Sequence, residues 1–267
     1  MSDLVLSLDH LSVGFDSTKG FTQILDDVSF TLSRGKTLAL VGESGSGKSL
    51  TAFSILRLLP PGGRICAGSV LFDGLDLVTL AEAQLTAIRG DRISMIFQEP
   101  MSALNPVFTV GWQIAEALRL HRSLTRRQAR VRAVELLAGV GIADPAARAR
   151  AYPHELSGGM RQRVMIAMAL ACEPDILIAD EPTTALDVTI QAQIIDLLLD
   201  LQQRFGTAIL VISHDLGVVS HLADDIAVMC AGRIIERGSA PAIIHNPSHH
   251  YTRALLDSVP RIEVGRV

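Results

Sequence analysis

The chain has 267 residues, of which 48% are hydrophobic and 19% are charged, and its formal net charge at pH 7 is −4. This length allows one large domain or a core with a subdomain, and the composition supplies a packed core and excludes wholesale disorder. The acidic balance argues against a dedicated nucleic-acid binder, which usually carries a basic face.

The N-terminus, the lengths of the apolar runs and the cysteines together predict a cytosolic protein. The sequence begins without a basic segment followed by an apolar run, so we expect no secretory signal. It contains no stretch of about 18 apolar residues, so we expect no membrane-spanning helix. A chain without such a helix can still dock onto membrane proteins. The cysteines Cys66, Cys172 and Cys230 are odd in number and scattered through apolar surroundings, which predicts buried free thiols in a reducing compartment.

The first part of the chain is expected to form strands with two helices between them. Apolar runs, alternating or continuous, predict strands over 4–11, 24–32, 37–41, 69–72 and 93–97. Helices are expected over 50–59, directly after the third strand, and over 81–89.

The pattern changes to helices between residue 99 and about residue 154. Apolar residues at helical spacing predict helices over 110–120 and 125–140. This block is therefore predicted to be a helical subdomain inserted into an α/β core. Its arginines are expected to form a solvated helix face: Arg122, Arg126, Arg127, Arg130 and Arg132.

Strand–helix alternation resumes after the helical block. The sequence predicts helices over 157–171, 188–204, 216–222 and 251–256, and strands over 175–179, 207–212, 225–229 and 233–237. Such alternation predicts an α/β fold with a mainly parallel sheet and helices on both faces.

Residues 42–49, GESGSGKS, fit the phosphate-binding pattern G-x-x-x-x-G-K-[ST]. Glycines allow the backbone N–H groups to wrap around phosphates, and the start of the following helix favours an anion. Lys48 is placed to reach the β- and γ-phosphates, and Ser49 to ligate Mg²⁺. The alternative is a glycine-rich turn that fits this pattern by chance. The strand and helix predicted on either side of the loop argue against that alternative. The candidate binding residues are Gly42, Ser44, Gly45, Ser46, Gly47, Lys48 and Ser49.

Two carboxylates follow the apolar strand that ends near residue 179. Asp180 lies where a strand end can orient Mg²⁺ or its waters, and Glu181 can polarise an attacking water as a general base. The alternative is that the strand leads into an acidic turn with no catalytic role. That would be the better interpretation in a chain without a phosphate loop.

Two more polar residues end apolar strands. His214 follows the strand over 207–212 and could bond the γ-phosphate or hold the water and Glu181, while Gln98 could reach Mg²⁺ or the water. Parallel-sheet logic places all of them at the ligand-binding edge with the phosphate loop. By itself, a histidine at a strand end is more often structural.

A second anion site is predicted at the start of the helix over 157–171. Ser157 caps that helix, and Gly158 and Gly159 permit close approach of the backbone at the positive end of the helix dipole. Simple capping explains Ser157 but leaves the two glycines and the basic residues after them unexplained.

In this combination the chain resembles the ATPase subunits of the ATP-binding cassette (ABC) family over residues 3–260. LSGG at 156–159 matches that family's signature motif, and the other motifs follow in the expected order. The resemblance implies a P-loop NTPase (RecA-like) core with a mainly parallel sheet, an N-terminal antiparallel β subdomain and an inserted α-helical subdomain. The expected division is 1–98 with 161–245 for the ATP-binding core, 99–160 for the insertion, and 246–267 for a tail.

The resemblance also implies the use of ATP and Mg²⁺ and roles for further residues. Phe15 would stack on adenine, where the family usually has Tyr, and a core Phe is the competing interpretation. Gln98 would sense a membrane partner. Two cassettes would face head to tail, with ATP on one loop closed over by Ser157 and Gly159 of the other chain. The segment facing the second ATPase would be Ala185, Leu186 and Asp187.

Three segments, 97–106, 152–155 and 247–256, are similar to ABC importers of oligopeptides, dipeptides and nickel. The implied function is an ATPase that powers uptake of a small solute, most plainly peptides, at the cytoplasmic face of the inner (plasma) membrane. Its partners would be two transmembrane permease subunits, a second ATPase, identical or related, and indirectly an extracytoplasmic solute-binding protein. The chain stops soon after Pro260, whereas many peptide-importer ATPases continue, and this leaves a nickel importer open.

Other classes explain less of the sequence. A soluble cassette protein of DNA repair, chromosomes or ribosomes would usually carry zinc insertions, coiled coils or two cassettes. A phosphoryl-transfer kinase leaves residues 156–163 unexplained, and exporter cassettes are commonly fused to membrane helices.

Overall fold

A six-stranded sheet forms the centre of the computed structural model, which describes residues 3–18, 20–184 and 186–257. The strand order is β10–β9–β3–β8–β7–β6, with β10 antiparallel to β9 and the other neighbours parallel. The strands are β3 (Thr37–Val41), β6 (Ile93–Ile96), β7 (Ile176–Asp180), β8 (Ala208–Ser213), β9 (Asp225–Cys230) and β10 (Arg233–Ser239). Every residue of β3, β7 and β8 is buried, as expected for parallel strands covered on both faces.

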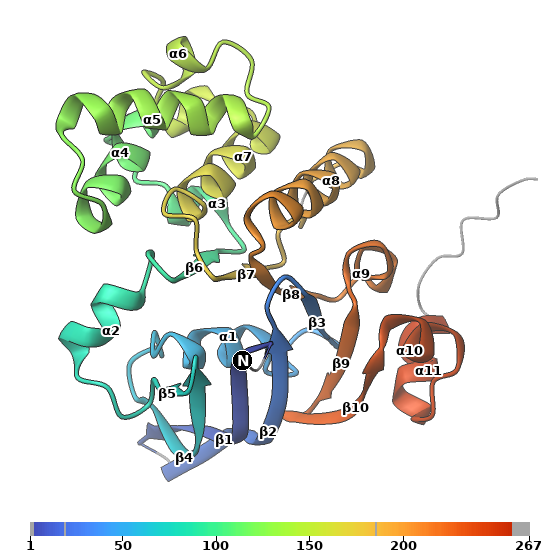
Figure 1. Ribbon diagram of the computed structural model, residues 1–267. Coiled ribbons are helices and arrows are strands. Elements are labelled where there is room, and N and C mark those ends of the chain that lie inside the picture. Colours follow the sequence, from blue (N-terminus) through green and yellow to red (C-terminus); the bar gives the residue numbers. More distant parts are fainter. Residues whose placement is uncertain (1–2, 19, 185, 258–267) are drawn as a thin grey trace, which may run out of the picture.

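A second, antiparallel sheet has the order β2–β1–β4–β5 and lies beneath the first (Figure 1). It comprises β1 (Leu4–Ser17), β2 (Gly20–Ser33), β4 (Gly63–Phe72) and β5 (Leu75–Asp76). The first two strands are longer than predicted, because shifts of register interrupt their alternation and hide its continuation. Three such shifts lie between residues 8 and 14 of β1, and His10 on β1 and Asp27 on β2 have left-handed backbones.

The two faces of the parallel sheet are covered differently. On one face, α8 (Val188–Phe205) and α9 (Leu216–Leu222) share a core with Ala39 and Val41. On the other face, α1 (Lys48–Ile55) and α2 (Glu82–Ile88) pack together with the antiparallel sheet against Leu38 and Leu40. The prediction of helices on both faces is therefore incomplete. The antiparallel strands β1, β2 and β4 also carry apolar side chains, and these are buried against the second face of the parallel sheet.

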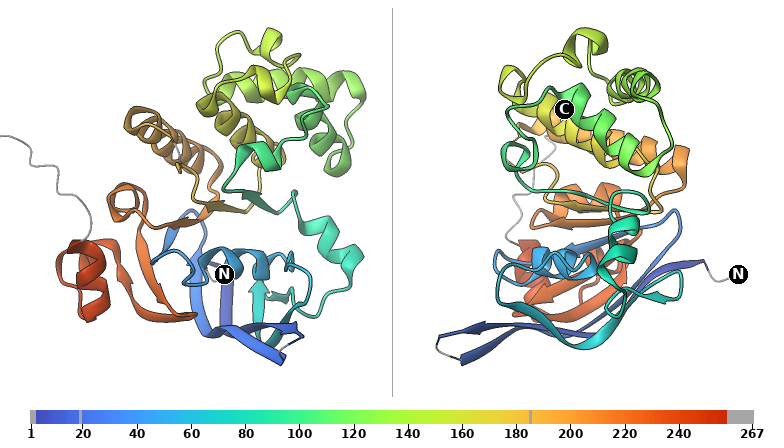
Figure 2. Two further views of the ribbon diagram at one scale, coloured as in Figure 1. Left: turned by 180° about the vertical axis from the view of Figure 1, so that it is seen from behind. Right: turned by 90° about the vertical axis from the view of Figure 1, so that its left-hand side faces the viewer.

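A helical lobe stands above the sheets in all views (Figures 1 and 2). It contains α3 (Pro100–Ala103), α4 (Val110–His121), α5 (Arg126–Gly139), α6 (Pro145–Arg148), a 3₁₀ turn (Pro153–Glu155) and α7 (Gly158–Ala169). Thr125 caps α5 with Gln128, and Asp144 caps α6 ahead of Pro145. The predicted division at residue 160 falls inside α7, which packs against α4, α5 and β6.

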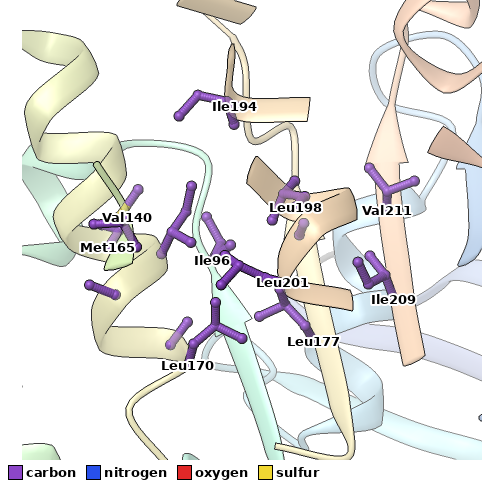
Figure 3. Packing of buried hydrophobic residues seen from close by; sticks show 14 of the residues in the cluster. Ile96, Val140, Met165, Leu170, Leu177, Ile194, Leu198, Leu201, Ile209 and Val211 are labelled. Carbon is purple, nitrogen blue, oxygen red and sulfur yellow. The ribbon is translucent and has the colours of Figure 1, made fainter. Parts of the chain in front are cut away.

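The lobe shares its core with the parallel sheet. Val140 and Met165 lie beside Ile96, and Leu170 and Leu177 continue the cluster toward α8 (Figure 3). Burial of this continuous apolar surface fixes the start of α7 relative to the sheet.

Two short helices follow the sheet, α10 (Ala240–His245) and α11 (His250–Asp257). Sequence analysis missed α10, which is only six residues long and has Pro241 in its first turn. All three cysteines are free thiols. Cys172 is buried and Cys230 half-buried, but Cys66 is exposed, so its predicted burial is wrong. It lies in the outer half of β4, where the strand extends beyond the core.

Glu236 on β10 anchors the segment that leads into α11. Its carboxylate accepts hydrogen bonds from the Ser248 N–H and hydroxyl, both at 2.6 Å, and from the His249 N–H at 3.1 Å. Partial burial raises the pKa of Glu236, but the hydrogen bonds from Ser248 and His249 outweigh it and lower the pKa to about 2.

We expect Glu236→Gln to lower the thermal midpoint of unfolding at neutral pH by a few degrees, because charge-assisted bonds worth about 1–3 kcal/mol are weakened. The folded-state pKa lies below the usual 4.5, so the carboxylate stabilises the fold above that pH and this contribution is lost as the pH falls toward 2. Melting curves of variant and wild type should therefore converge below pH 4.5. Glu99→Gln, at an exposed position, is the control. An equal loss in that control would contradict the anchoring role.

Candidate functional site

Residues 42–49 connect the end of β3 to the start of α1, as predicted. The loop passes so close to β9 that a Cβ on Gly42 would lie 2.2 Å from the Met229 carbonyl oxygen. Gly47 caps α1 with φ 108°, and a Cβ there would meet Leu25 at 2.6 Å. Close approach and a left-handed backbone thus demand glycine at both positions.

Lys48, the first residue of α1, is buried, and its side chain reaches back across the loop. Its Nζ donates hydrogen bonds to the carbonyl oxygens of Gly42 and Glu43, each at 2.8 Å. Burial lowers the pKa of Lys48, and the charges of Glu181, Asp180 and Glu43 oppose that shift. The Ser46 hydroxyl is buried and has no hydrogen-bond partner within the described residues. A buried cation, an orphaned hydroxyl and a helix N-terminus together fit a phosphate group.

Ser49 and Asp180 meet beside the loop. The Ser49 hydroxyl donates to Asp180 Oδ1 at 3.1 Å, across 131 positions of sequence. Asp180 is only 2% exposed. Burial raises the pKa of its carboxyl, while the Ser49 bond and Lys48 act in the opposite direction. Hydroxyl and carboxylate oxygens are ligands that Mg²⁺ accepts, so this pair fits the ion.

The Glu181 carboxylate is held from three sides. Gln98 donates to Oε2 at 3.0 Å, Thr184 donates to Oε2 at 2.8 Å, and His214 Nδ1 lies 3.2 Å from Oε1. The residue has a left-handed backbone, φ 47°, and its N–H donates to the Ile212 carbonyl at 2.9 Å. Such a conformation in a non-glycine residue is typical of functional sites, where the surroundings enforce it.

Sequence analysis missed Thr184. The turn from Glu181 to Thr184, closed by a 3.2 Å backbone hydrogen bond, returns its hydroxyl to the carboxylate. A threonine three residues after a candidate base is the only signal in the sequence, and it gains meaning only once the turn is known.

The predicted second anion site lies apart from the phosphate loop. Ser157 caps α7, accepting from the Met160 N–H at 3.4 Å, and α7 belongs to the helical lobe (Figures 1 and 2). A Cβ on Gly159 would lie 3.1 Å from Ile190, and one on Gly158 would lie 3.9 Å from Leu186. The residues 157–159 therefore adjoin the start of α8.

The remaining residues predicted for the site lie away from the Glu181 carboxylate or outside the described part of the chain. Asp187 caps α8 by accepting from the Ile190 N–H at 2.9 Å, and Ala185 lies outside the described residues. Phe15 is half-buried on β1, where its ring contacts Gly63 of β4. Those contacts hold it in the antiparallel sheet and leave the adenine role an expectation.

The C-terminal helix reaches the phosphate loop. The Glu43 N–H donates to the Tyr251 hydroxyl oxygen at 3.1 Å, which joins α11 to the second residue of the loop. Sequence analysis placed Tyr251 in a predicted helix and in the similarity over 247–256, and gave it no role at the phosphate loop. No pattern in the chain pairs a tyrosine with a loop 208 positions earlier.

Comparison with known families gives two matches. The family model described as ABC transporter matches residues 25–184, which is more than half of the chain. The model described as oligopeptide/dipeptide transporter, C-terminal region, matches residues 235–267. None of the described helices is both long enough and apolar enough to cross a membrane.

Individual proteins are similar over nearly the whole chain. A probable peptide ABC transporter ATP-binding protein of Sinorhizobium fredii is 53% identical over 99% of this chain and 79% of its own length. A dipeptide transport ATP-binding protein of Bacillus subtilis is 52% identical over 98% of this chain and 78% of its own. A solved dimeric ATP-binding cassette bound to ADP and Pi is 29% identical, with a TM-score of 0.79, over 88% of this chain and 98% of that one.

We expect Tyr251→Phe to weaken binding of a nucleoside triphosphate by about threefold to tenfold, because one hydrogen bond that positions the loop is lost. A positioning role predicts a higher KM with little change in kcat, and nucleotide titration with steady-state kinetics measures both. Tyr152→Phe, at the other tyrosine of the chain, is the matched control. Unchanged affinity in Tyr251→Phe, or a fall in kcat alone, would contradict the role.

Proposed function

The chain belongs to the ABC transporter family, and on this premise we propose that it is the ATP-hydrolysing subunit of an importer that moves peptides across the inner membrane. One observation carries the proposal of hydrolysis. The Glu181 carboxylate is fixed by Gln98, Thr184 and His214 at the same sheet edge as Lys48 and the Ser49–Asp180 pair.

The proposed chemistry assigns one task to each group. Lys48 and the N–H groups of residues 42–49 bind the phosphates of ATP. Ser49, Asp180 and Gln98 would hold Mg²⁺, which would supply electrostatic stabilisation of the transferred phosphoryl group. Glu181 accepts the proton of the attacking water, and His214 orients that carboxylate. Because Glu181 is pre-positioned by its neighbours, little reorganisation is needed at the moment of reaction.

We further propose that two cassettes complete each nucleotide site. Ser157 starts a helix whose dipole favours an anion, yet α7 lies in a different lobe from the loop of its own chain. A second cassette, facing the first head to tail, would bring Ser157 and Gly159 of one chain to the ATP of the other. The segment from Leu186 to Asp187 adjoins Gly158 and would lie at the same interface, with Ala185 expected beside it.

Peptides are the proposed solute rather than nickel. The C-terminal family model and the relatives named above concern oligopeptide and dipeptide transport. The chain would act at the cytoplasmic face of the membrane with two permease subunits, and a solute-binding protein outside would deliver the peptide. The surface near Gln98 is proposed to face the permeases.

We expect Glu181→Gln to bind ATP and to hydrolyse it about 10²–10⁴ times more slowly, because the amide cannot accept the proton. A filter-binding assay and phosphate release measure the two properties. The nucleotide-bound dimer should accumulate, as size-exclusion chromatography would show. Turnover at the wild-type rate would contradict the assignment of the base.

Mixing two inactive variants tests the head-to-tail dimer. We expect Ser157→Arg and Lys48→Ala chains to be inactive alone, since each damages both composite sites of its homodimer. A mixed dimer carries both changes in one site and leaves the other intact, so mixing should restore part of the ATPase activity. A chain carrying both changes, mixed with wild type, has one change in each site and is the matched control. No gain on mixing the single variants would contradict composite sites.

The transport function is tested by purifying the chain with its permeases from its own membrane. We expect a peptide-loaded binding protein to stimulate ATP hydrolysis in the reconstituted complex, and a nickel-loaded one to leave it unchanged. Stimulation by the nickel-loaded protein instead would show that the solute is nickel and not a peptide. Association with ribosomes or DNA in place of permeases would contradict the proposed transport function.

A further inference from the structure

The two oxygens of the Glu181 carboxylate have unequal surroundings. Oε2 accepts hydrogen bonds from Gln98 Nε2 at 3.0 Å and from the Thr184 hydroxyl at 2.8 Å. Oε1 has one hydrogen-bond neighbour in the described part of the chain, His214 Nδ1 at 3.2 Å. Each carboxylate oxygen accepts about two hydrogen bonds, so Oε2 is saturated and Oε1 retains a free acceptor site.

A tight turn brings the Thr184 hydroxyl to Oε2. Pro182 follows Glu181, and the Thr184 N–H donates to the Glu181 carbonyl oxygen at 3.2 Å, which closes a β-turn with proline at its second position. Proline favours that position because its ring fixes φ near the value that the turn needs. Thr184 is thus bonded to Glu181 twice, through its backbone and through its hydroxyl.

The two donors on Oε2 differ in what else they are proposed to do. Gln98 lies just after the end of β6, and its amide is also a proposed ligand of Mg²⁺. The described hydrogen bond of the Thr184 hydroxyl is with the base alone. The Glu181 side chain is only 14% exposed, so water offers little replacement for a lost donor. Thr184 is therefore the donor that is dedicated to the carboxylate.

We propose that Thr184 is a positioning residue for hydrolysis, which holds Oε2 so that the free acceptor site of Oε1 faces the attacking water. In the reaction, the water oxygen bonds to the γ-phosphorus while the bond from that phosphorus to the ADP oxygen breaks, and the electron pair stays on ADP. One proton of the water passes to Oε1. This inference rests on the proposed function, which assigns the general base to Glu181.

The flexibility of glutamate explains why a second anchor is needed. The last torsion of a glutamate side chain is only weakly restricted. When Oε2 is held by fewer donors, the carboxylate rotates about this torsion and presents its free acceptor site to the water less often. The rate of the chemical step then falls, while the binding of ATP by the phosphate loop is unaffected.

Removal of the hydroxyl tests this role. Thr184→Val keeps the shape of the side chain and removes the donor. We expect kcat for ATP hydrolysis to fall about tenfold, with KM and ATP binding changed by less than about twofold, because the hydroxyl bonds to the base and not to the phosphate loop. Thr184→Ser retains a hydroxyl and should recover at least about half of the wild-type kcat. Phosphate release and filter binding measure these quantities.

Thr183→Val is the matched control, since it makes the same change at the neighbouring threonine. Thr183 is buried, and its hydroxyl makes no hydrogen bond to Glu181. We expect the wild-type kcat in this control. An equal fall in Thr183→Val, or a fall in Thr184→Val that Thr184→Ser does not repair, would contradict the positioning role in favour of a general disturbance of the turn.

A double variant separates an effect on the base from an effect on the fold. In a Glu181→Gln chain the proton acceptor is already absent, so the addition of Thr184→Val should lower the residual kcat by less than about twofold. A tenfold fall in both backgrounds would overturn the proposal. Thr184→Ala gives the same comparison where the valine lowers the melting temperature.

The outcomes distinguish the role of Thr184 from the proposed function. Wild-type turnover in Glu181→Gln would remove the base itself, and the role of Thr184 with it. Impaired turnover in Glu181→Gln together with the wild-type kcat in Thr184→Val would overturn this inference alone and leave the proposed ATPase intact.

Discussion

Parallel pairing of four buried strands is the constraint on which the site depends. β3, β8, β7 and β6 lie side by side and run in the same direction, so their carboxyl ends meet at one edge. Val41 pairs with Ser213, and Asp180 with Ile212, which brings the phosphate loop, the two carboxylates and His214 together. Helices bury one face of these strands, and helices with the antiparallel sheet bury the other. A slip of one residue would turn apolar side chains to the wrong face, so the core fixes the register of the site.

Glu181 shows how the surroundings hold an unfavourable local conformation. A left-handed backbone in a non-glycine residue costs roughly 1–3 kcal/mol. The backbone bond to Ile212 and the side-chain contacts with Gln98, Thr184 and His214 each contribute about 0.5–1.5 kcal/mol, so together they outweigh that cost. The carboxylate is thus already oriented before any ligand arrives, which is the property that the proposed general base needs.

One feature of the chain implies a partner. The start of α7 lies in the helical lobe, apart from the phosphate loop of its own chain, and carries the positive end of a helix dipole. Tyr251 and Glu236 instead make contacts within the chain. Tyr251 joins the C-terminal helix to the phosphate loop, and Glu236 joins the segment before that helix to the sheet. The tail is therefore part of the folded domain through residue 257.

The sequence by itself determined the α/β class, the phosphate loop and the polar residues at the strand ends, because these rest on local patterns of spacing and glycine placement. The P-loop NTPase fold expected from the resemblance agrees with the solved cassettes. Only the tertiary structure decided how the antiparallel sheet covers the parallel one, that Thr184 returns to Glu181, and that Tyr251 reaches Glu43 across 208 positions. It also showed that Arg122 and Arg132 of the predicted solvated face form ion pairs, with Asp91 and Glu173. Such contacts depend on which residues the core brings together over long sequence separations, and no local pattern records that information.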